Sequence, residues 1–315
     1  MGAGVGVRPG IVISNWLAAA MCFAAAAASG AETFRIATYN VEGYLEAATA
    51  SRTAKSAQSK AKVRESILAL KPDVLALEEI GSAGALFELR DALKAEGLDL
   101  PNWELVGGAD TNIYVAILSK FPFTARRPHT NDHFLLTGRR FRVSRGFAEV
   151  DIQVDSHYAF TLFAAHLKSR RTMAIADEAE LRLEEAKLLR EKIDARLAGN
   201  PNANLVVLGD FNDSKDSAST KAVIGKGKFK LVDTRPAERN GDDARAWSAG
   251  QEPRNVNWTH YYARDDTYSR LDYIMLSPGM ARDWVPGGTY VLNLPNWGIG
   301  SDHRPLVATF EASDN

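Results

Sequence analysis

The sequence predicts a single domain in which β-strands alternate with amphipathic helices. Short apolar runs rich in valine, isoleucine and leucine, each bounded by polar residues or glycine, are typical of buried strands. Apolar residues also recur at helical spacing, most clearly over residues 177–197. With 315 residues the chain can bury a substantial core, and residues 31–315 contain no internal repeat or low-complexity linker. One domain over residues 31–315 is therefore expected.

Residues 1–30 have the layout of a secretory signal peptide. A short start with Arg8 precedes a long apolar run, and small residues follow as far as Ala31. The only cysteine, Cys22, lies in this segment, so cleavage after Gly30 or Ala31 would leave a mature chain without cysteine. A membrane anchor, a buried N-terminal helix or a lipoprotein anchor through Cys22 are the alternatives. We expect a periplasmic or secreted monomer whose mature chain has no membrane span.

Helix and strand patterns alternate in the first half of the domain. Residues 34–40 alternate in polarity as a half-buried strand does. Val63, Ile67 and Leu70 share one helical face, and Pro72 ends that helix. The expected elements are a strand at 34–40, a helix at 59–70, a strand at 73–80, a helix at 84–96, and strands at 103–106 and 113–119. A long loop is expected at 124–144.

Two long strands and the clearest helix follow. The strands at 146–154 and 158–167 are close enough in sequence to pair as a hairpin. Asp177 and Glu180 form a capping pattern at the start of the helix at 177–197, whose charges are expected to form a solvated face. A buried strand is expected within 204–213 and further strands at 258–262, 271–276 and 306–310, whereas residues 214–253 show no clear pattern.

Polar side chains stand at the ends of several apolar strands. Each of these side chains can bind a metal ion or a phosphate or can move a proton, and each has an ordinary explanation as a turn or surface residue. Their recurrence in chain order favours one common site. They are Asn40, Glu79, His166, Asp210 with Asn212, Asp272, and Asp302 with His303. Because neighbouring strand residues point to opposite faces, only one of Glu78 and Glu79 is expected to face the site.

The motifs around these residues resemble the endonuclease/exonuclease/phosphatase superfamily. The resemblance rests on Tyr39-Asn40, Leu77-Glu78-Glu79, Ala116-Ile-Leu-Ser-Lys120, His166-Leu-Lys-Ser169, Gly209-Asp-Phe-Asn212, Arg270-Leu-Asp-Tyr273 and Ser301-Asp-His-Arg-Pro305. It covers nearly the whole mature chain. It implies an α+β fold, a four-layer α/β/β/α sandwich of two mixed β-sheets with helices on the outer faces, and a site at one end of the sandwich. The motifs are specific for the superfamily but indicate almost nothing about the substrate.

The resemblance also implies a role for each site residue. Glu79 would be the principal ligand of Mg²⁺ or Mn²⁺, aided by Asn40 and by Asp302, either directly or through water. For catalysis, Asp210 would orient or deprotonate the attacking water, and Asn212 would hold a phosphate oxygen. His303 would stabilise the phosphoryl group or carry a proton, and Asp272 would fix the His303 ring. His166 would face the leaving group. One departure is Glu78, which stands where many relatives have glutamine and adds a negative charge.

The overall charge does not predict a polyanionic substrate by itself. Residues 31–315 carry 37 basic and 39 acidic side chains, a formal charge of −2. Binding of nucleic acid would therefore need local basic patches. Candidates for phosphate contacts are Arg142, Arg145, Lys168 and Arg170; the arginine-rich segment 124–144 is interpreted either as a solvated loop or as a phosphate-facing rim. His129 and His133 lie in this segment and are interpreted as loop residues, not zinc ligands.

The expected function is a secreted or periplasmic metal-dependent phosphodiester hydrolase, in the first instance a nuclease. A phospholipid or sphingomyelin phosphodiesterase, or a phosphomonoesterase of the same fold, is the first alternative. A lipid substrate calls for an exposed apolar surface, and residues 284–297 are the only candidate, although they are equally interpreted as part of the core. A non-catalytic module that binds a phosphate ligand is the remaining alternative.

Overall fold

The computed structural model describes residues 1–6, 32–50, 52–239 and 255–313. The predicted signal peptide lies almost wholly outside the described residues, and residues Met1–Gly30 form a unit separate from Ala31–Asn315. The account below concerns the second unit. Within the described parts of the chain, no helix is long and apolar enough to cross a membrane.

Two mixed six-stranded sheets form the centre of this unit. The first has the strand order β15 (Trp284–Val291), β16 (Leu306–Ala312), β1 (Glu32–Tyr44), β2 (Val74–Ile80), β4 (Tyr114–Ser119) and β3 (Asn102–Val106). The second has the order β11 (Val232–Asp233), β14 (Asp272–Leu276), β10 (Leu205–Asp210), β9 (Ala159–His166), β8 (Phe147–Gln153) and β5 (Phe123–Arg126). In each sheet one central pair is parallel, β1 with β2 and β9 with β10.

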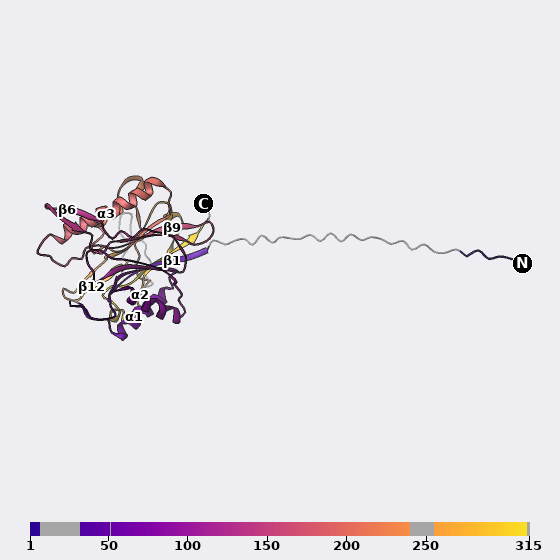
Figure 1. Cartoon of the computed structure of the whole chain (residues 1–315), viewed down its shortest axis with the longest axis horizontal. Helices are drawn as coiled ribbons and strands as arrows, with labels where there is room; N and C mark the ends of the chain where they lie inside the picture. The colour runs from indigo at the N-terminus through magenta and orange to yellow at the C-terminus, as the bar shows by residue number, and fades with distance from the viewer. Residues whose placement is uncertain (7–31, 51, 240–254, 314–315) are drawn as a thin grey trace. The chain divides into compact units, whose positions relative to one another are not determined.

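Helices cover the outer faces of the sheets. In Figure 1, α1 (Ala57–Leu70) and α2 (Ala83–Ala95) lie on one side of the sheets and α3 (Glu178–Gly199) lies on the other, where α4 (Ala218–Ile224) also packs. Two hairpins stand apart, β6 (His133–Leu136) with β7 (Arg139–Arg142), and β12 (His260–Tyr262) with β13 (Thr267–Ser269). Short 3₁₀ helices occur at Gly227–Phe229, Met280–Arg282 and Trp297–Ile299. This arrangement is the four-layer α+β sandwich that the resemblance implies.

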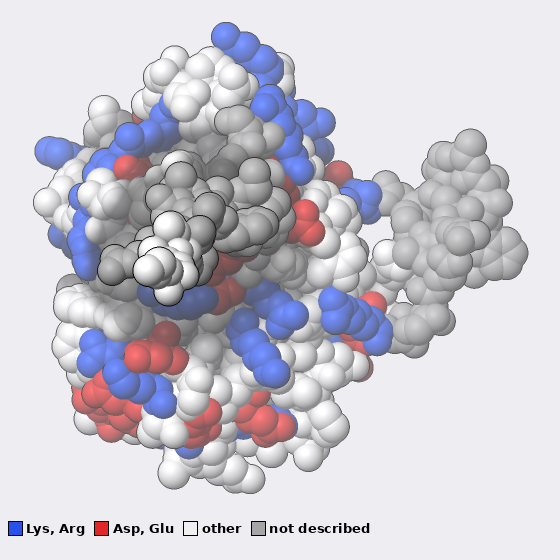
Figure 2. All heavy atoms as spheres, turned by 90° about the vertical axis from the view of Figure 1, so that its right-hand side faces the viewer, with Lys and Arg blue, Asp and Glu red and all other residues white. Residues whose placement is uncertain are grey.

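The core follows from strand and helix periodicity. Between the sheets, the Phe34 ring stacks on Phe160 and on Phe310, with 5.5 Å between ring centroids in both pairs. On the outer faces, Ile67 of α1 and Leu189 of α3 are fully buried against the sheets. The surface carries both charge signs, and on the face shown in Figure 2 basic and acidic side chains are interspersed.

Strand register brings the polar strand ends into line. Asp210 at the end of β10 pairs with His166 of β9 on one side and with Asp272 of β14 on the other. In the first sheet, Asn40 of β1 pairs with Glu78 of β2. Because these rows lie at the same end of the two packed sheets, residues far apart in sequence meet in a single site.

Some predicted elements differ from the structure. The segment 124–144 is not a long loop, since it contains most of β5 and the β6–β7 hairpin. Its strands were hidden because arginines occupy three of the four positions of β7, while Phe134 and Phe141 stack on each other with 5.9 Å between their centroids. Residues 214–253 contain α4 and β11, although residues 240–254 lie outside the described residues.

Two further strands also differ. β1 does not stop at Asn40 but continues to Tyr44, after a shift of its register against β2. The shift uses left-handed backbone at Glu42 and Gly43, with φ of 48° and 66°. Further along the chain, the predicted strand at 258–262 is shorter, and it pairs with β13, which the sequence does not reveal.

Candidate active site

Asp210 lies at the centre of the site. Its Oδ2 atom accepts hydrogen bonds from Asn40 Nδ2 at 3.0 Å and from Asn212 Nδ2 at 3.2 Å, and its Oδ1 atom accepts one from the backbone N–H of Asn212 at 2.8 Å. Burial raises the pKa of Asp210 to about 6, and repulsion from Asp272 acts in the same direction. The site thus holds a buried carboxylate in a fixed orientation, with a pKa close to that of a useful general base.

The backbone before Asp210 requires glycine. Gly209 has φ of +123°, a region that residues with a side chain rarely adopt. A Cβ atom at this position would lie 2.1 Å from the carbonyl oxygen of Ala165 and 3.0 Å from Oε1 of Glu78. The glycine of the Gly-Asp-Phe-Asn motif therefore allows β9 and the first sheet to approach β10 closely.

A buried histidine and carboxylate pair stands beside Asp210. His303 Nδ1 lies 2.8 Å from Asp272 Oδ2, and His303 Nε2 lies 3.8 Å from Asp210 Oδ2. Burial alone would lower the pKa of this imidazole, but the carboxylates of Asp272 and Asp210 raise it well above the ordinary histidine value. The arrangement favours a cationic His303 that donates from Nδ1 to Asp272 and presents Nε2 to the site.

His166 approaches Asp210 from the neighbouring strand. Its Nε2 atom lies 3.5 Å from Asp210 Oδ2, and its side chain is fully buried. Burial lowers the pKa of His166 well below its ordinary value, and the positive charges of Arg145 and His303 act in the same direction. The two histidines therefore favour different charge states, because the carboxylates of Asp272 and Asp210 outweigh burial at His303, whereas burial and nearby cations act together at His166.

Glu78 and Glu79 take different places. Glu78 is fully buried, and its Oε1 atom accepts a hydrogen bond from the Thr38 hydroxyl at 2.8 Å. Burial raises the pKa of Glu78 well above its ordinary value, and repulsion from Asp272 acts in the same direction, which favours the uncharged form of this side chain. Glu79 has φ of 68° and turns toward the more open side of the site, where its Oε2 atom lies 3.0 Å from Arg52 Nη1.

Oxygen ligands gather where the resemblance places a metal ion. Burial raises the pKa of Glu42, and repulsion from Asp302 and then from Glu79 acts in the same direction, opposed by Lys55. The Oδ1 atom of Asn40 faces the same segment and accepts the backbone N–H of Glu42 at 3.0 Å. Crowded carboxylates with an amide oxygen form the hard, anionic donor set that suits Mg²⁺ or Mn²⁺. The residues present therefore fit a divalent cation.

A basic cleft of about 630 Å³ adjoins the site. Three of the four predicted phosphate-binding residues, Arg142, Arg145 and Lys168, line it. The fourth, Arg170, does not; its Nε atom donates to the carbonyl oxygen of Asn212 at 3.0 Å and so supports the catalytic loop. The remaining basic lining residues are Arg52, Arg139, Arg140 and Arg171.

The sequence did not indicate all residues around the site. Arg52 and Lys55 lie in a polar segment without a motif, and Glu42 follows the predicted end of β1. The expectation that the charges of α3 form a solvated face is wrong for Glu185, which is 1 % exposed. Its carboxylate accepts hydrogen bonds from the N–H groups of Ser144 and Lys168, at 2.8 and 2.7 Å, and so fixes the floor of the cleft.

Comparison with known proteins identifies the family. The family model described as the endonuclease/exonuclease/phosphatase family matches residues 37–303. No curated protein sequence gives a significant match.

Solved structures share the fold at low identity. A truncated TDP2 from Caenorhabditis elegans is 16% identical, with a TM-score of 0.59 and coverage of 89% of this chain and 98% of that one. The human Nocturnin catalytic domain with bound sulfate is 18% identical, with a TM-score of 0.60 and coverage of 89% and 95%. Sphingomyelinase C from Streptomyces griseocarneus is 20% identical, with a TM-score of 0.58 and coverage of 89% and 100%. The chain belongs to the endonuclease/exonuclease/phosphatase family, a family of metal-dependent phosphoesterases.

Proposed function

We propose that the protein is an exported phosphodiesterase that depends on Mg²⁺ or Mn²⁺ and cleaves nucleic acid. The observation that carries this proposal is the grouping of Asp210, His303 and Asp272 at the end of the two sheets, next to a cleft lined by basic side chains. The predicted signal peptide supports export to the periplasm or secretion.

In this proposal Asp210 is the general base. Hydrogen bonds from Asn40 and Asn212 hold its carboxylate in place, and a pKa of about 6 leaves it mostly ionised at neutral pH. It accepts a proton from the water that attacks phosphorus in line with the leaving group. The Nδ2 atom of Asn212 also donates to the backbone carbonyl of Leu167 at 3.0 Å, which holds the Asn212 amide beside Asp210.

His303 and His166 serve the phosphoryl group and the leaving oxygen. A cationic His303, oriented by Asp272, stabilises the negative charge that develops on the phosphoryl oxygens or donates a proton. His166, whose Nε2 atom lies 3.5 Å from Asp210 Oδ2, would face the leaving group. Glu79, Asn40 and Asp302 would hold the divalent cation, which when bound supplies neutralisation of charge on the phosphate.

The cleft favours a nucleic acid substrate. Seven basic side chains line it, against the two acidic side chains of Asp110 and Glu185. Glu185 is fully engaged with the protein backbone, so the cleft presents a net positive surface. Phosphates on either side of the scissile bond would find cations there, and such contacts provide most of the affinity of sequence-independent binding.

One observation favours a lipid phosphodiesterase as the second candidate. Exposed apolar side chains occur beside the same cleft, where Leu135 is 73% and Ile175 is 52% exposed. The segment 284–297, the only candidate from the sequence, is less suitable, because Val291 is buried and Trp284 packs against the core in the edge strand β15.

A substrate panel tests both candidates. Plasmid DNA, RNA, bis-p-nitrophenyl phosphate, sphingomyelin and inositol phosphates are offered to the wild type and to Asp210→Ala, with Mg²⁺ and with EDTA. We expect hydrolysis of DNA or RNA that EDTA abolishes and that Asp210→Ala lowers by on the order of 100-fold to 1000-fold. Preference for sphingomyelin would select the second candidate. A folded wild type that hydrolyses none of the substrates would favour the non-catalytic binding module.

A further inference from the structure

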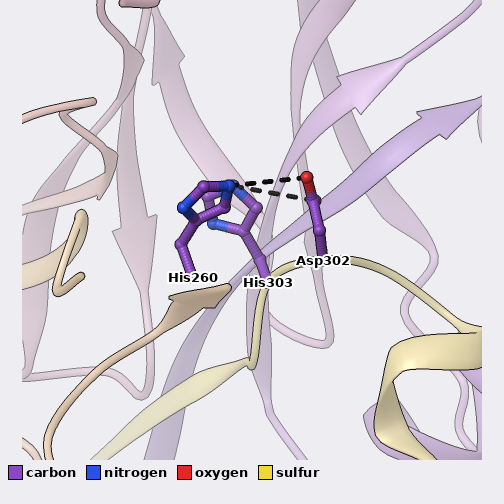
Figure 3. Close-up of side chains that lie close together, drawn as sticks. All are labelled: His260, Asp302 and His303. Carbon is purple, nitrogen blue, oxygen red and sulfur yellow. Dashed lines mark ion pairs between the residues drawn. The ribbon is translucent and has the colours of Figure 1, made fainter. Parts of the chain in front are cut away.

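His260 places a second imidazole beside that of His303, and no sequence motif predicts it. Figure 3 shows His260 and His303 side by side, with both rings directed toward the carboxylate of Asp302. His260 Nε2 lies 3.5 Å from Asp302 Oδ2, and His303 Nε2 lies 3.9 Å from Asp302 Oδ1. The ring centroids of the two histidines are 4.6 Å apart. One ligand atom from each of the three residues lies within 4.8 Å of the other two.

Backbone contacts hold these three side chains in place. The β12 strand that carries His260 forms a bridge with the loop that carries His303. On either side of this bridge, the N–H of Tyr261 donates to the carbonyl of Asp302 at 3.0 Å, and the N–H of Arg304 donates to the carbonyl of Thr259 at 2.6 Å. These backbone hydrogen bonds therefore fix the segments that carry the three side chains relative to one another.

The donor set suits a transition metal better than magnesium. Atoms bound at about 2.1 Å by a tetrahedral metal lie roughly 3.4 Å apart, so the separations of 3.5 and 3.9 Å between the imidazole nitrogens and the Asp302 oxygens need only a small contraction. Two imidazole nitrogens and one carboxylate are typical zinc ligands, whereas Mg²⁺ prefers oxygen. Asp272 already accepts from Nδ1 of His303, which is the carboxylate–histidine–metal arrangement of many zinc sites.

We propose that His260, Asp302 and His303 form a second cation site, selective for Zn²⁺ over Mg²⁺, that shares Asp302 with the oxygen-rich site at Asn40 and Glu79. Its distinguishing member is His260, which has no part in the proposed hydrolysis. Zn²⁺ bound there occupies Nε2 of His303 and one oxygen of Asp302. One consequence rests on the proposed function: if the protein is the proposed hydrolase, Zn²⁺ bound at this site inhibits it even when Mg²⁺ is in excess.

Calorimetric titration of Zn²⁺ into the tag-free protein with excess Mg²⁺ tests the site without any assay of activity. Wild type is compared with His260→Gln and with His157→Gln, the same change at an exposed histidine. We expect His260→Gln to weaken Zn²⁺ binding by at least ~10-fold, since even loss of a group that only supports a ligand costs this much. His157→Gln is expected to bind as the wild type does. Thermal unfolding without Zn²⁺ checks that both variants are folded.

The outcomes separate this proposal from the proposed function. Equal Zn²⁺ binding by folded His260→Gln and wild type would overturn the second site, and so would binding that excess Mg²⁺ abolishes in the wild type. Binding that depends on His260 in a protein that hydrolyses no phosphodiester would support the site and reject the function. Where hydrolysis is observed, the Zn²⁺ concentration for half inhibition should rise in His260→Gln by the same factor as the dissociation constant.

Discussion

Replacement of Asp272 by asparagine tests the role of the buried pair with His303. The two side chains are almost fully buried, and the hydrogen bond between them measures 2.8 Å. Asparagine keeps the size of the side chain but removes the charge that stabilises a cationic imidazole. It can also present its NH₂ group to Nδ1, which would place the ring proton on Nε2 of a neutral histidine.

The size of the effect follows from the hydrogen bond that is lost. A hydrogen bond to a charged group contributes about 1.5–3 kcal/mol, and each 1.4 kcal/mol corresponds to a factor of ten. If the contact of the cationic His303 with the phosphoryl group strengthens mainly in the transition state, kcat should fall by about 10-fold to 150-fold, whereas KM should change little. Hydrolysis of bis-p-nitrophenyl phosphate at saturating Mg²⁺ measures both constants.

A matched control removes a similar charge away from the site. Glu149 is 2% exposed and its Oε2 atom lies 2.7 Å from Nε2 of the half-buried His129, so Glu149→Gln alters a second pair of a buried carboxylate and a histidine. This variant should lose stability but keep kcat. A folded Asp272→Asn that retains the wild-type kcat, while His303→Ala is inactive, would show that Asp272 does not act through His303.

Two predictions concern stability. Gly209→Ala should lower the melting temperature by an amount equivalent to about 1–3 kcal/mol, because the added Cβ would meet the backbone of Ala165; unchanged melting would show that this approach can relax. Asp213 has a lowered pKa because hydrogen bonds from Ser219 and Arg182, with the charge of Arg182, outweigh the effect of burial. Ionised Asp213 therefore stabilises the folded protein above about pH 3.9, the pKa of the side chain in the unfolded chain. This stabilisation is lost as pH falls through the lower pKa of the folded protein. The melting temperature should consequently fall less steeply from about pH 5 to pH 3 in Asp213→Asn than in wild type, and equal slopes would contradict this assignment.

The sequence predicted the part of the site that strand ends define. His166 and Asp210 each end an apolar strand and Asp272 begins one, and the pairing of these strands places the three residues in one row. Local pattern is sufficient there, because a buried strand and the polar residue at its end are adjacent in sequence. The helices and most of the strands were predicted for the same reason, whereas the two-sheet sandwich was implied only by the family resemblance.

Contacts between distant segments could not be predicted in this way. His260 meets Asp302 through the β12 bridge to the final loop, and Glu185 reaches Ser144 across 41 residues. Neither residue differs locally from an ordinary strand or helix residue. The β6–β7 hairpin was likewise concealed, since arginines occupy three of the four positions of β7 and the aromatic contact between its strands is a single stacked pair, Phe134 and Phe141.

The two glutamates show why a correct local rule can still leave roles open. Alternation predicts that Glu78 and Glu79 point to opposite faces, and this rule applies only while the strand stays regular. At Glu79 the backbone becomes left-handed, and the register between β2 and β4 shifts between Glu78 and Ile80. As a result one glutamate is buried beside Asp272 and Asp210, and the other turns to Arg52 near the oxygen-rich site. The unusual φ value is a cost that the surrounding structure must offset, and its place beside the candidate metal ligands favours a functional reason for it.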